Sequence, residues 1–386
     1  LHDALPICGV SSSTFDGAIA GTGGLVKNGA GILTLGGANL FSGGVALNGG
    51  GLVVGNNAAL GSGALNVGAD ASLDSSLAVT LGNAIDLTAG ANLNLLGSNA
   101  LTLGGVISGG GGLVKSGAAT VTLTGANTYT GGTTINSGTL AIGAGGSLAS
   151  AGAVNLAGAG TLDISGGGNQ SIGSLAGVTG SAVSLGGNTL TLGGVGNTAF
   201  NGVIGGTGAL IKDGAGVQTL GGANTFTGGV TLNAGGLVVG NNTAGGSTIT
   251  VNNETGGQIK GIFNIGTLLG FGGQAVTAQN AAGGTTTLVN DGSIGMSLLG
   301  LGQVADATSV VTYGGAQANV TNRGSITGRV GLGASAGNTF TNAGTVSGSV
   351  HLGDSTGGNT FTAVAGSSVA AGGGLAAAGT LVGVAG

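Results

Sequence analysis

The sequence of 386 residues contains little charge, one proline, one cysteine and no tryptophan. Charged residues make up 4% of the chain and only six of them are basic, so no basic surface is expected that could bind the nucleic-acid backbone. One cysteine excludes a disulfide framework. The scarcity of proline suits a fold in which nearly every backbone N–H belongs to a sheet. No window combines a helical apolar period with helix caps.

Glycine is abundant, with 96 residues, and apolar residues supply 41% of the chain. Collagen is excluded because glycine follows no Gly-X-Y period and proline is almost absent. Disorder is excluded because Val, Ile, Leu and Thr alternate in short runs, such as residues 120–125 and 247–252. These runs, each closed by Gly or Asn, predict short strands along the whole chain.

A 38-residue unit occurs three times and aligns without a gap, at residues 19–56, 107–144 and 204–241. A lysine, an asparagine and an aromatic residue recur at the same positions of each copy. They are Lys27, Lys115 and Lys212; Asn39, Asn127 and Asn224; and Phe41, Tyr129 and Phe226. The lysines are 88 and 97 residues apart, so the spacers vary in length. A fixed unit with variable spacers indicates a repeat architecture.

A shorter repeat follows nearer the C-terminus. Residues 320–340 and 341–361 share an Asn-x-Gly-[Ser/Thr]-[Ile/Val] start and end on Gly-Asn-Thr-Phe, at Phe340 and Phe361. Residues 289–298 look like a degenerate earlier copy. A period of roughly 20 residues is typical of one turn of a solenoid.

Both repeats predict an all-β fold, a right-handed parallel β-helix (β-solenoid) from about residue 15 to 362. A lone short strand leaves backbone groups unpaired and one apolar face exposed, whereas stacked turns pair each strand with its copy one rung away. Gly and Asn supply the tight corners. At roughly 20 residues per rung, we expect about 18 rungs.

Composition divides the chain into five segments. Residues 1–8 hold the only proline and cysteine and are interpreted as a non-native leader. The β-helix with the three copies follows at 9–252, irregular rungs or an insertion at 253–288, shorter rungs at 289–362, and an apolar, Ala/Gly-rich truncated end at 363–386. The last segment is too rich in glycine, and too poor in flanking Lys or Arg, for a membrane-spanning helix.

Every 38-residue copy carries Gly-x-Leu-x-Lys, then Thr-Leu, then Asn-x-aromatic-x-Gly, then Gly-x-Leu. This order resembles the passenger-associated strand repeat of bacterial autotransporters. The shorter rungs are similar to those further along such passengers and in large bacterial adhesins. The resemblance implies a Gram-negative protein whose β-helical part is displayed outside the cell at the outer membrane surface. We see no signal peptide and no barrel pattern, so we expect a passenger fragment, with the translocator barrel outside it.

The recurring positions of the three copies predict structural roles. We expect Asn39, Asn127 and Asn224 at corners, with their amides hydrogen-bonded to neighbouring backbone. We expect the aromatic residues to pack beside them. The three lysines are expected to be largely exposed, with their stems along the strand surface.

Two local motifs resemble catalytic sequences. Residues 353–358 (GDSTGG) would make Ser355 a serine-protease nucleophile, but the rung alignment places it in a turn and sets His351 opposite Gly331. Residues 109–116 (GGGGLVKS) mimic a phosphate loop, but valine precedes the lysine and no helix follows. We interpret both as structural corners.

Acidic residues are too sparse for the paired carboxylates of a glycosidase. The nearest sets are Asp70 with Asp74 and Asp291 with Asp306, which we interpret as chance spacing on a solvated face. No ligand set for zinc and no calcium-binding repeat is present. We therefore predict no catalytic, cofactor-binding or metal-binding residue, and no enzyme.

The favoured hypothesis is a stalk that acts in adhesion, autoaggregation or biofilm formation. Its partners would be a host or abiotic surface, glycans, matrix proteins or its own copies. One alternative is a polysaccharide-active β-helix enzyme. Another is an ice-binding solenoid, which needs a regular double ladder of threonines. The Thr-x-Thr pairs, as at 120–124, 189–191 and 248–250, are scattered between the copies.

Overall fold

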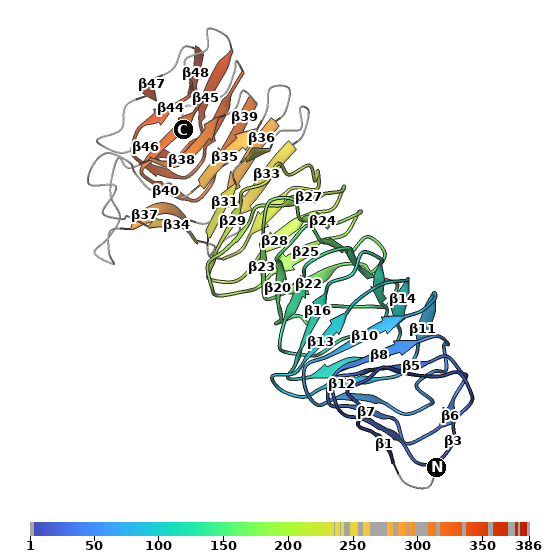
Figure 1. Cartoon of the computed structure of the whole chain (residues 1–386). Coiled ribbons are helices and arrows are strands. Elements are labelled where there is room, and N and C mark those ends of the chain that lie inside the picture. The colour runs from blue at the N-terminus through green and yellow to red at the C-terminus, as the bar shows by residue number, and fades with distance from the viewer. Residues whose placement is uncertain are drawn as a thin grey trace. The chain divides into compact units, whose positions relative to one another are not determined.

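The computed structural model of the chain is built from β-strands (Figure 1), and none of its described residues forms a helix. The structure describes residues 4–386 except 235, 240, 243–247, 254–257, 263–275, 281–284, 292, 298–307, 314–316, 334–336, 354–357, 370–374, 377–378 and 384–386. The chain divides into two compact units, Leu1–Asn188 and Thr189–Gly386. A membrane-spanning helix is not found among the described residues.

The first unit contains three long parallel sheets and one two-stranded parallel sheet. The first sheet comprises β1 (Leu5–Ile7), β4 (Leu25–Lys27), β7 (Val45–Leu47), β9 (Leu65–Val67), β12 (Ile85–Leu87) and β15 (Ile107–Gly109). The second comprises β2 (Ser13–Phe15), β5 (Ile32–Leu35), β8 (Gly51–Val54), β10 (Ala71–Ser75), β13 (Asn92–Leu95), β16 (Gly112–Lys115), β18 (Thr133–Ile135), β20 (Ala153–Leu156) and β23 (Ser174–Gly177). The third comprises β11 (Val79–Leu81), β14 (Leu101–Leu103), β17 (Val121–Leu123), β19 (Thr139–Ile142), β21 (Thr161–Asp163) and β24 (Ala182–Ser184). β3 (Ala20–Gly21) and β6 (Leu40–Phe41) form the two-stranded sheet, and the remaining strand of this unit is β22 (Gln170–Ile172).

Neighbouring strands within each sheet of the first unit pair in parallel and lie one turn of the chain apart. Val45 faces Leu65, for example, and Leu65 faces Ile85. Along a strand the side chains alternate, so that Leu65 and Val67 are buried and Asn66 between them is exposed. The inward positions therefore stack Leu, Ile and Val in columns that form a continuous core.

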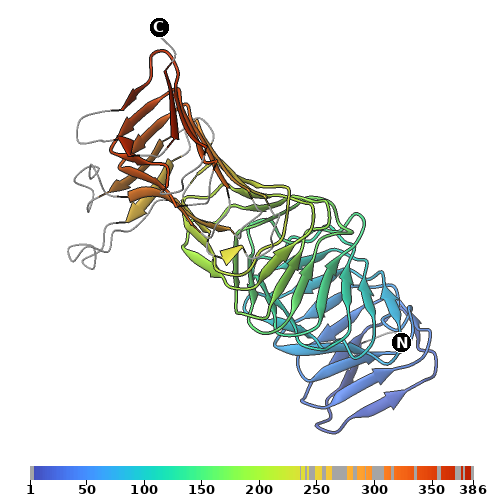
Figure 2. The same ribbon diagram turned by 90° about the horizontal axis from the view of Figure 1, so that it is seen from above.

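The second unit also contains long parallel sheets, which Figures 1 and 2 show as strands lying side by side. The fourth sheet comprises β25 (Leu190–Leu192), β28 (Leu210–Lys212), β30 (Val230–Leu232), β33 (Thr248–Asn253), β36 (Thr285–Asn290), β39 (Gln317–Asn322), β42 (Thr339–Asn342), β45 (Asn359–Ala363) and β48 (Gly379–Gly383). The fifth comprises β32 (Asn241–Asn242), β35 (Val276–Asn280), β38 (Thr308–Tyr313), β41 (Arg329–Leu332), β44 (Val350–His351) and β47 (Leu375–Ala376). The sixth comprises β34 (Gln258–Ile262), β37 (Ser293–Ser297), β40 (Ser325–Thr327), β43 (Thr345–Ser347) and β46 (Ser368–Val369). The remaining strands are β26 (Thr198–Phe200), β27 (Val203–Gly205), β29 (Val217–Leu220) and β31 (Gly236–Val239).

A ladder of buried asparagines runs through the fourth sheet. The amide nitrogen of Asn290 donates to Oδ1 of Asn322 at 2.6 Å, and that of Asn322 donates to Oδ1 of Asn342 at 2.8 Å. One inward position away, the rings of Phe340 and Phe361 stack with centroids 5.6 Å apart and an interplanar angle of 16°. Matched polar and aromatic columns fix the register, because a slip of one residue would expose them.

The predicted fold class, an all-β parallel solenoid, is confirmed. The structure has about 14 turns rather than the about 18 expected. Long rungs in the second unit account for part of the difference, since Thr248 pairs with Thr285 and Thr285 with Gln317, steps of 37 and 32 residues. At the N-terminus, Leu5–Ile7 pairs with Leu25–Lys27, so a strand lies within the segment interpreted as a leader.

Replacing Asn322 with alanine tests the ladder. The variant removes the acceptor of the Asn290 amide and the donor to Asn342, so we expect the free energy of unfolding to fall by roughly 2 kcal/mol or more. Urea unfolding followed by far-UV circular dichroism measures it. The control is Thr321→Ala, which changes a half-buried outward neighbour and should cost less than about 1 kcal/mol. Equal losses in the two variants would refute the ladder's role.

Candidate functional site: the recurring lysine, asparagine and aromatic positions

Each 38-residue copy pairs with itself. In the first copy Leu25–Lys27 lies against Val45–Leu47, and Ile32–Leu35 against Gly51–Val54. The second and third copies do the same, in the pairs β16 with β18, β17 with β19, β28 with β30 and β29 with β31. The copies do not share one face, since Lys27 lies in the first sheet and Lys115 in the second. Each sequence repeat is therefore a segment whose two halves pair with each other, and its first strand can lie in different sheets of the solenoid.

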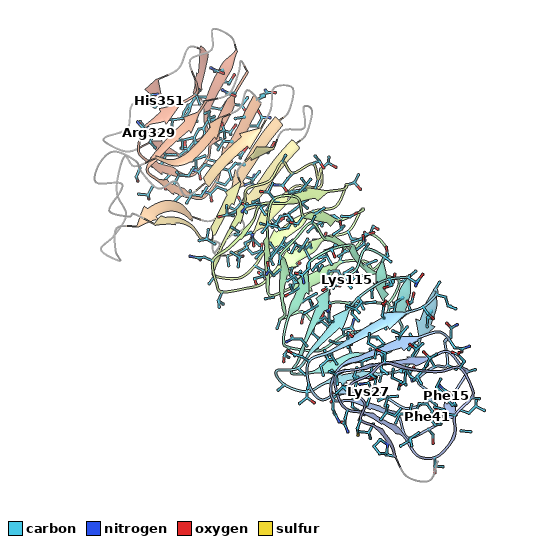
Figure 3. All side chains as sticks on the ribbon, in the orientation of Figure 1. Phe15, Lys27, Phe41, Lys115, Arg329 and His351 are labelled. Carbon is cyan, nitrogen blue, oxygen red and sulfur yellow. The ribbon has the colours of Figure 1, made fainter. Side chains whose placement is uncertain are left out.

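The three lysines point into the core, contrary to the expected exposure. Lys27, Lys115 and Lys212 are 2%, 0% and 4% exposed, and Figure 3 marks the first two on the ribbon of the first unit. Each lies at an inward position of its strand, two residues after an inward leucine. The alternation of the strand thus overrides the tendency of lysine to reach solvent.

Backbone carbonyl oxygens at the corners accept hydrogen bonds from the ammonium groups of these lysines. Nζ of Lys27 donates to the carbonyl oxygen of Gly29 at 2.7 Å, and Lys115 and Lys212 donate to the equivalent Gly117 and Gly214. Nζ of Lys27 also donates to Gly49 O, and that of Lys115 to Ser137 O, each at 3.3 Å and one turn further on. Lys27 and Lys115 therefore satisfy corner acceptors of two successive turns from inside.

Burial lowers the pKa of all three lysines, and nearby acidic groups oppose this shift. Asp74 acts on the pKa of Lys115, Asp213 on that of Lys212, and Cys8 on that of Lys27. Asp74 is buried, so its expected place on a solvated face was wrong. Its Oδ1 accepts hydrogen bonds from the backbone N–H groups of Ser75 and Ser98, which ties two turns together.

The recurring asparagines bridge neighbouring turns, Asn39 and Asn127 through both ends of the amide and Asn224 through its oxygen alone. Oδ1 of Asn39 accepts from Ile19 N at 2.8 Å, 20 residues before it, and Nδ2 donates to Ala59 O at 2.6 Å, 20 residues after it. Asn127 does the same with Ile107 N and Ser147 O, both at 2.8 Å. Asn224 accepts from Ile204 N at 2.9 Å and donates to Gly222 O at 3.0 Å.

A second set of asparagines was missed by the sequence analysis. Asn48, Asn136 and Asn233 follow the three lysines by 21 residues. Their amides donate to the residue after each lysine, at 2.9 Å to Asn28 Oδ1, 3.4 Å to Ser116 Oγ and 3.4 Å to Asp213 Oδ1. The recurrence of these asparagines in all three copies was the available signal.

The aromatic residues are buried, with Phe41 0%, Tyr129 1% and Phe226 6% exposed. The hydroxyl of Tyr129 forms a 2.6 Å hydrogen bond with Thr133 Oγ1. Burial raises the pKa of Tyr129 to about 12, against a smaller lowering by Thr133. The two phenylalanine copies carry valine at the position of Thr133. A polar pair in one copy is thus replaced as a pair by apolar groups in the others.

The motifs that resemble catalytic sequences have structural positions. Gly112–Lys115 is a strand with Lys115 inward, which is no phosphate loop. His351 is exposed and pairs with Gly331, as the rung alignment predicts. Asp354, Ser355 and Asp306 lie outside the described residues.

The other acidic residues make local contacts. Asp70 accepts from Asn92 N at 2.8 Å. Both carboxylate oxygens of Asp291 bind the guanidinium of Arg323, at 2.5 and 2.8 Å, and this hydrogen bonding lowers the pKa of Asp291. No group of three His, Cys, Asp or Glu suited to a metal ion occurs among the residues described.

Outward threonines form columns. In the third sheet Thr80, Thr102 and Thr122 make a single column. In the fourth sheet there are two parallel columns, Asn319 with Thr339 and Thr360, and Thr321 with Thr341 and Thr362. The Thr-x-Thr pairs seen in the sequence did not indicate these two columns, in which Asn319 takes one of the threonine positions.

The family model described as passenger-associated-transport-repeat matches residues 25–54, 113–142 and 210–239. Each match begins at the leucine two residues before the recurring lysine and ends on the last strand of the self-paired copy. Comparisons with curated proteins and with solved structures find no match. The chain therefore carries three passenger-associated transport repeats on a parallel β-solenoid.

Replacing Lys115 with methionine tests the inward lysine. The variant removes the donor to Gly117 O and Ser137 O while keeping the length of the side chain, so we expect the free energy of unfolding to fall by roughly 1–3 kcal/mol. Urea unfolding at neutral pH measures this. Val114→Met, at the outward neighbour, should change it by about 0.5 kcal/mol at most. A Lys115→Met protein as stable as wild type would show that the ammonium contributes nothing.

Alkaline unfolding tests Tyr129. In the folded chain the pKa of Tyr129 is about 12, above the ordinary tyrosine value of 10.0. The stabilisation gained by keeping Tyr129 protonated is therefore complete below pH 10 and is lost as the pH rises through 12. We expect wild type to lose roughly 2–3 kcal/mol over this range relative to Y129F/T133V, which copies the Phe and Val of the other repeats. Unfolding at stepped pH values checks it, and a parallel pH dependence in the two proteins would contradict the shift.

Proposed function

We propose that this chain is the non-catalytic passenger stalk of a bacterial autotransporter and acts in adhesion, autoaggregation or biofilm formation. The three passenger-associated transport repeats and the solenoid fit a passenger domain. That family implies a secreted protein associated with the outer membrane. We place this chain outside the cell, displayed at the outer membrane surface of a Gram-negative bacterium.

The observation that carries the proposal is the use of the recurring polar groups inside the solenoid. Lys27 and Lys115 bind corner carbonyls, Asn39 and Asn127 bridge three turns, and Tyr129 pairs with a threonine. Polar groups that are hydrogen-bonded inside the solenoid hold its turns together and are not directed at a substrate. A repeat whose polar residues are internal suits a scaffold that presents a long surface.

The outward positions of the scaffold suit weak, numerous contacts. Thr, Ser, Asn and small apolar residues dominate them, and charged residues make up only 4% of the chain. Each contact of this kind is weak, but contacts repeated along successive turns give avidity. The partners we propose are host or abiotic surfaces, glycans, matrix proteins and other copies of the chain.

Several acidic residues already serve structure, which supports a non-catalytic role. Asp74 accepts from Ser98, and Asp291 is bound by Arg323. A glycosidase needs two carboxylates directed at one bond. Polysaccharide-active chemistry remains the alternative that the experiment below distinguishes.

Surface display tests the proposal. Cells that lack adhesins would display residues 9–386 on an unrelated translocator barrel, and we expect clumping and retention on at least one of glycan arrays, matrix proteins or plastic. The control cells display the barrel with a globular passenger of similar size. The purified chain would be assayed in parallel for cleavage of polysaccharides and peptides.

The two assays separate the hypotheses. Clumping or retention above the control, without turnover, is the expected result. Cells that behave like the control in every binding assay, together with turnover of a polysaccharide by the purified chain, would replace adhesion with the enzyme hypothesis.

A further inference from the structure

The outward face of the fourth sheet presents a two-column grid across four consecutive strands, β36, β39, β42 and β45. One column contains Thr287, Asn319, Thr339 and Thr360, and the other contains Val289, Thr321, Thr341 and Thr362. All eight side chains are half-buried and alternate with buried neighbours. None of the eight is charged. The face is therefore a regular array of hydroxyl, amide and methyl groups.

The spacing of this grid follows from strand geometry. Neighbouring strands lie about 4.8 Å apart, and residues two apart on one strand lie about 6.6 Å apart. The backbone register extends the first column to Thr250 on one side and Thr380 on the other. Thr339 Oγ1 donates to Asn319 Oδ1 at 2.9 Å, so the column also holds its side chains in place.

The interior of the same strands fixes the register of the grid. Asn290, Asn322 and Asn342 form a hydrogen-bonded ladder beneath it, and the Phe340 and Phe361 rings stack one inward position away. A slip of one residue would break both inward columns, so the outward residues of these rungs stay aligned in rows.

We propose that this face binds ice. A repeated, uncharged grid is complementary to a solid that itself repeats, and the water oxygens on the faces of ice lie on a grid of comparable size. Threonine offers a hydroxyl that donates and accepts, beside a methyl group that orders water. Each contact is weak, so binding depends on many of them acting at once. This inference does not rest on the adhesive role proposed above.

Partition into ice tests the proposal with the purified chain. Fluorescently labelled protein would be offered to a slowly growing ice hemisphere, and inhibition of ice recrystallisation would be measured over a dilution series. We expect the wild-type chain to enter the ice and to slow recrystallisation. Thr341→Lys places a long charged side chain in the middle of the grid and should raise the concentration needed by about tenfold or more.

The matched control is Thr122→Lys, on the single threonine column of the third sheet, which should behave like wild type. Thr362→Lys, one rung from Thr341, serves as a second grid variant if Thr341→Lys fails to fold by circular dichroism. Exclusion of the folded wild-type chain from ice overturns the proposal. An equal loss of ice binding in the control variant and the grid variants overturns the proposal too. So does binding to microcrystalline cellulose without binding to ice, which would assign the grid to a polysaccharide.

Discussion

Each turn of the solenoid pairs with the next in parallel and in register, and this pairing decides which residues become neighbours. Once Leu25 faces Val45 and Leu65 faces Ile85, the other residues of these strands also acquire a fixed neighbour in the adjacent turn. Each side chain then belongs to a column of side chains stacked across successive turns. Leucines form an apolar core in this way, and polar residues form ladders by the same rule.

Columns allow this chain to bury polar groups that are costly one at a time. The amide of Asn322 finds both a donor and an acceptor in the asparagines of the adjacent turns. The ammonium of Lys115 finds carbonyl groups at its own corner and at the next. In each case at least one partner comes from a neighbouring turn, so these hydrogen bonds also oppose a change of register.

The sequence was sufficient to predict the fold class, because few folds besides a solenoid combine glycine-bounded alternation with fixed repeats. It also placed His351 opposite Gly331. The inward lysines could not be predicted from residue type, since exposure is the usual state of lysine and only the strand's alternation reverses it. The grid of β36 to β45 was hidden for another reason. Its members are 20, 21 or 32 residues apart, and pairing alone shows which of them align.

The self-pairing of each 38-residue copy has a consequence for how such a chain can change in length. The strands of the first half find their partners in the second half of the same segment, so a duplicated segment would bring its own partners with it. The duplicated segment would need only a spacer that brings the chain back to one of the sheets. Any sheet would serve, because Lys27 and Lys115 of the first unit already lie in two different sheets. Duplication or loss of a whole segment therefore keeps the strand pairs of this fold intact. Deletion of half a segment would leave its remaining strands without their pairing partners.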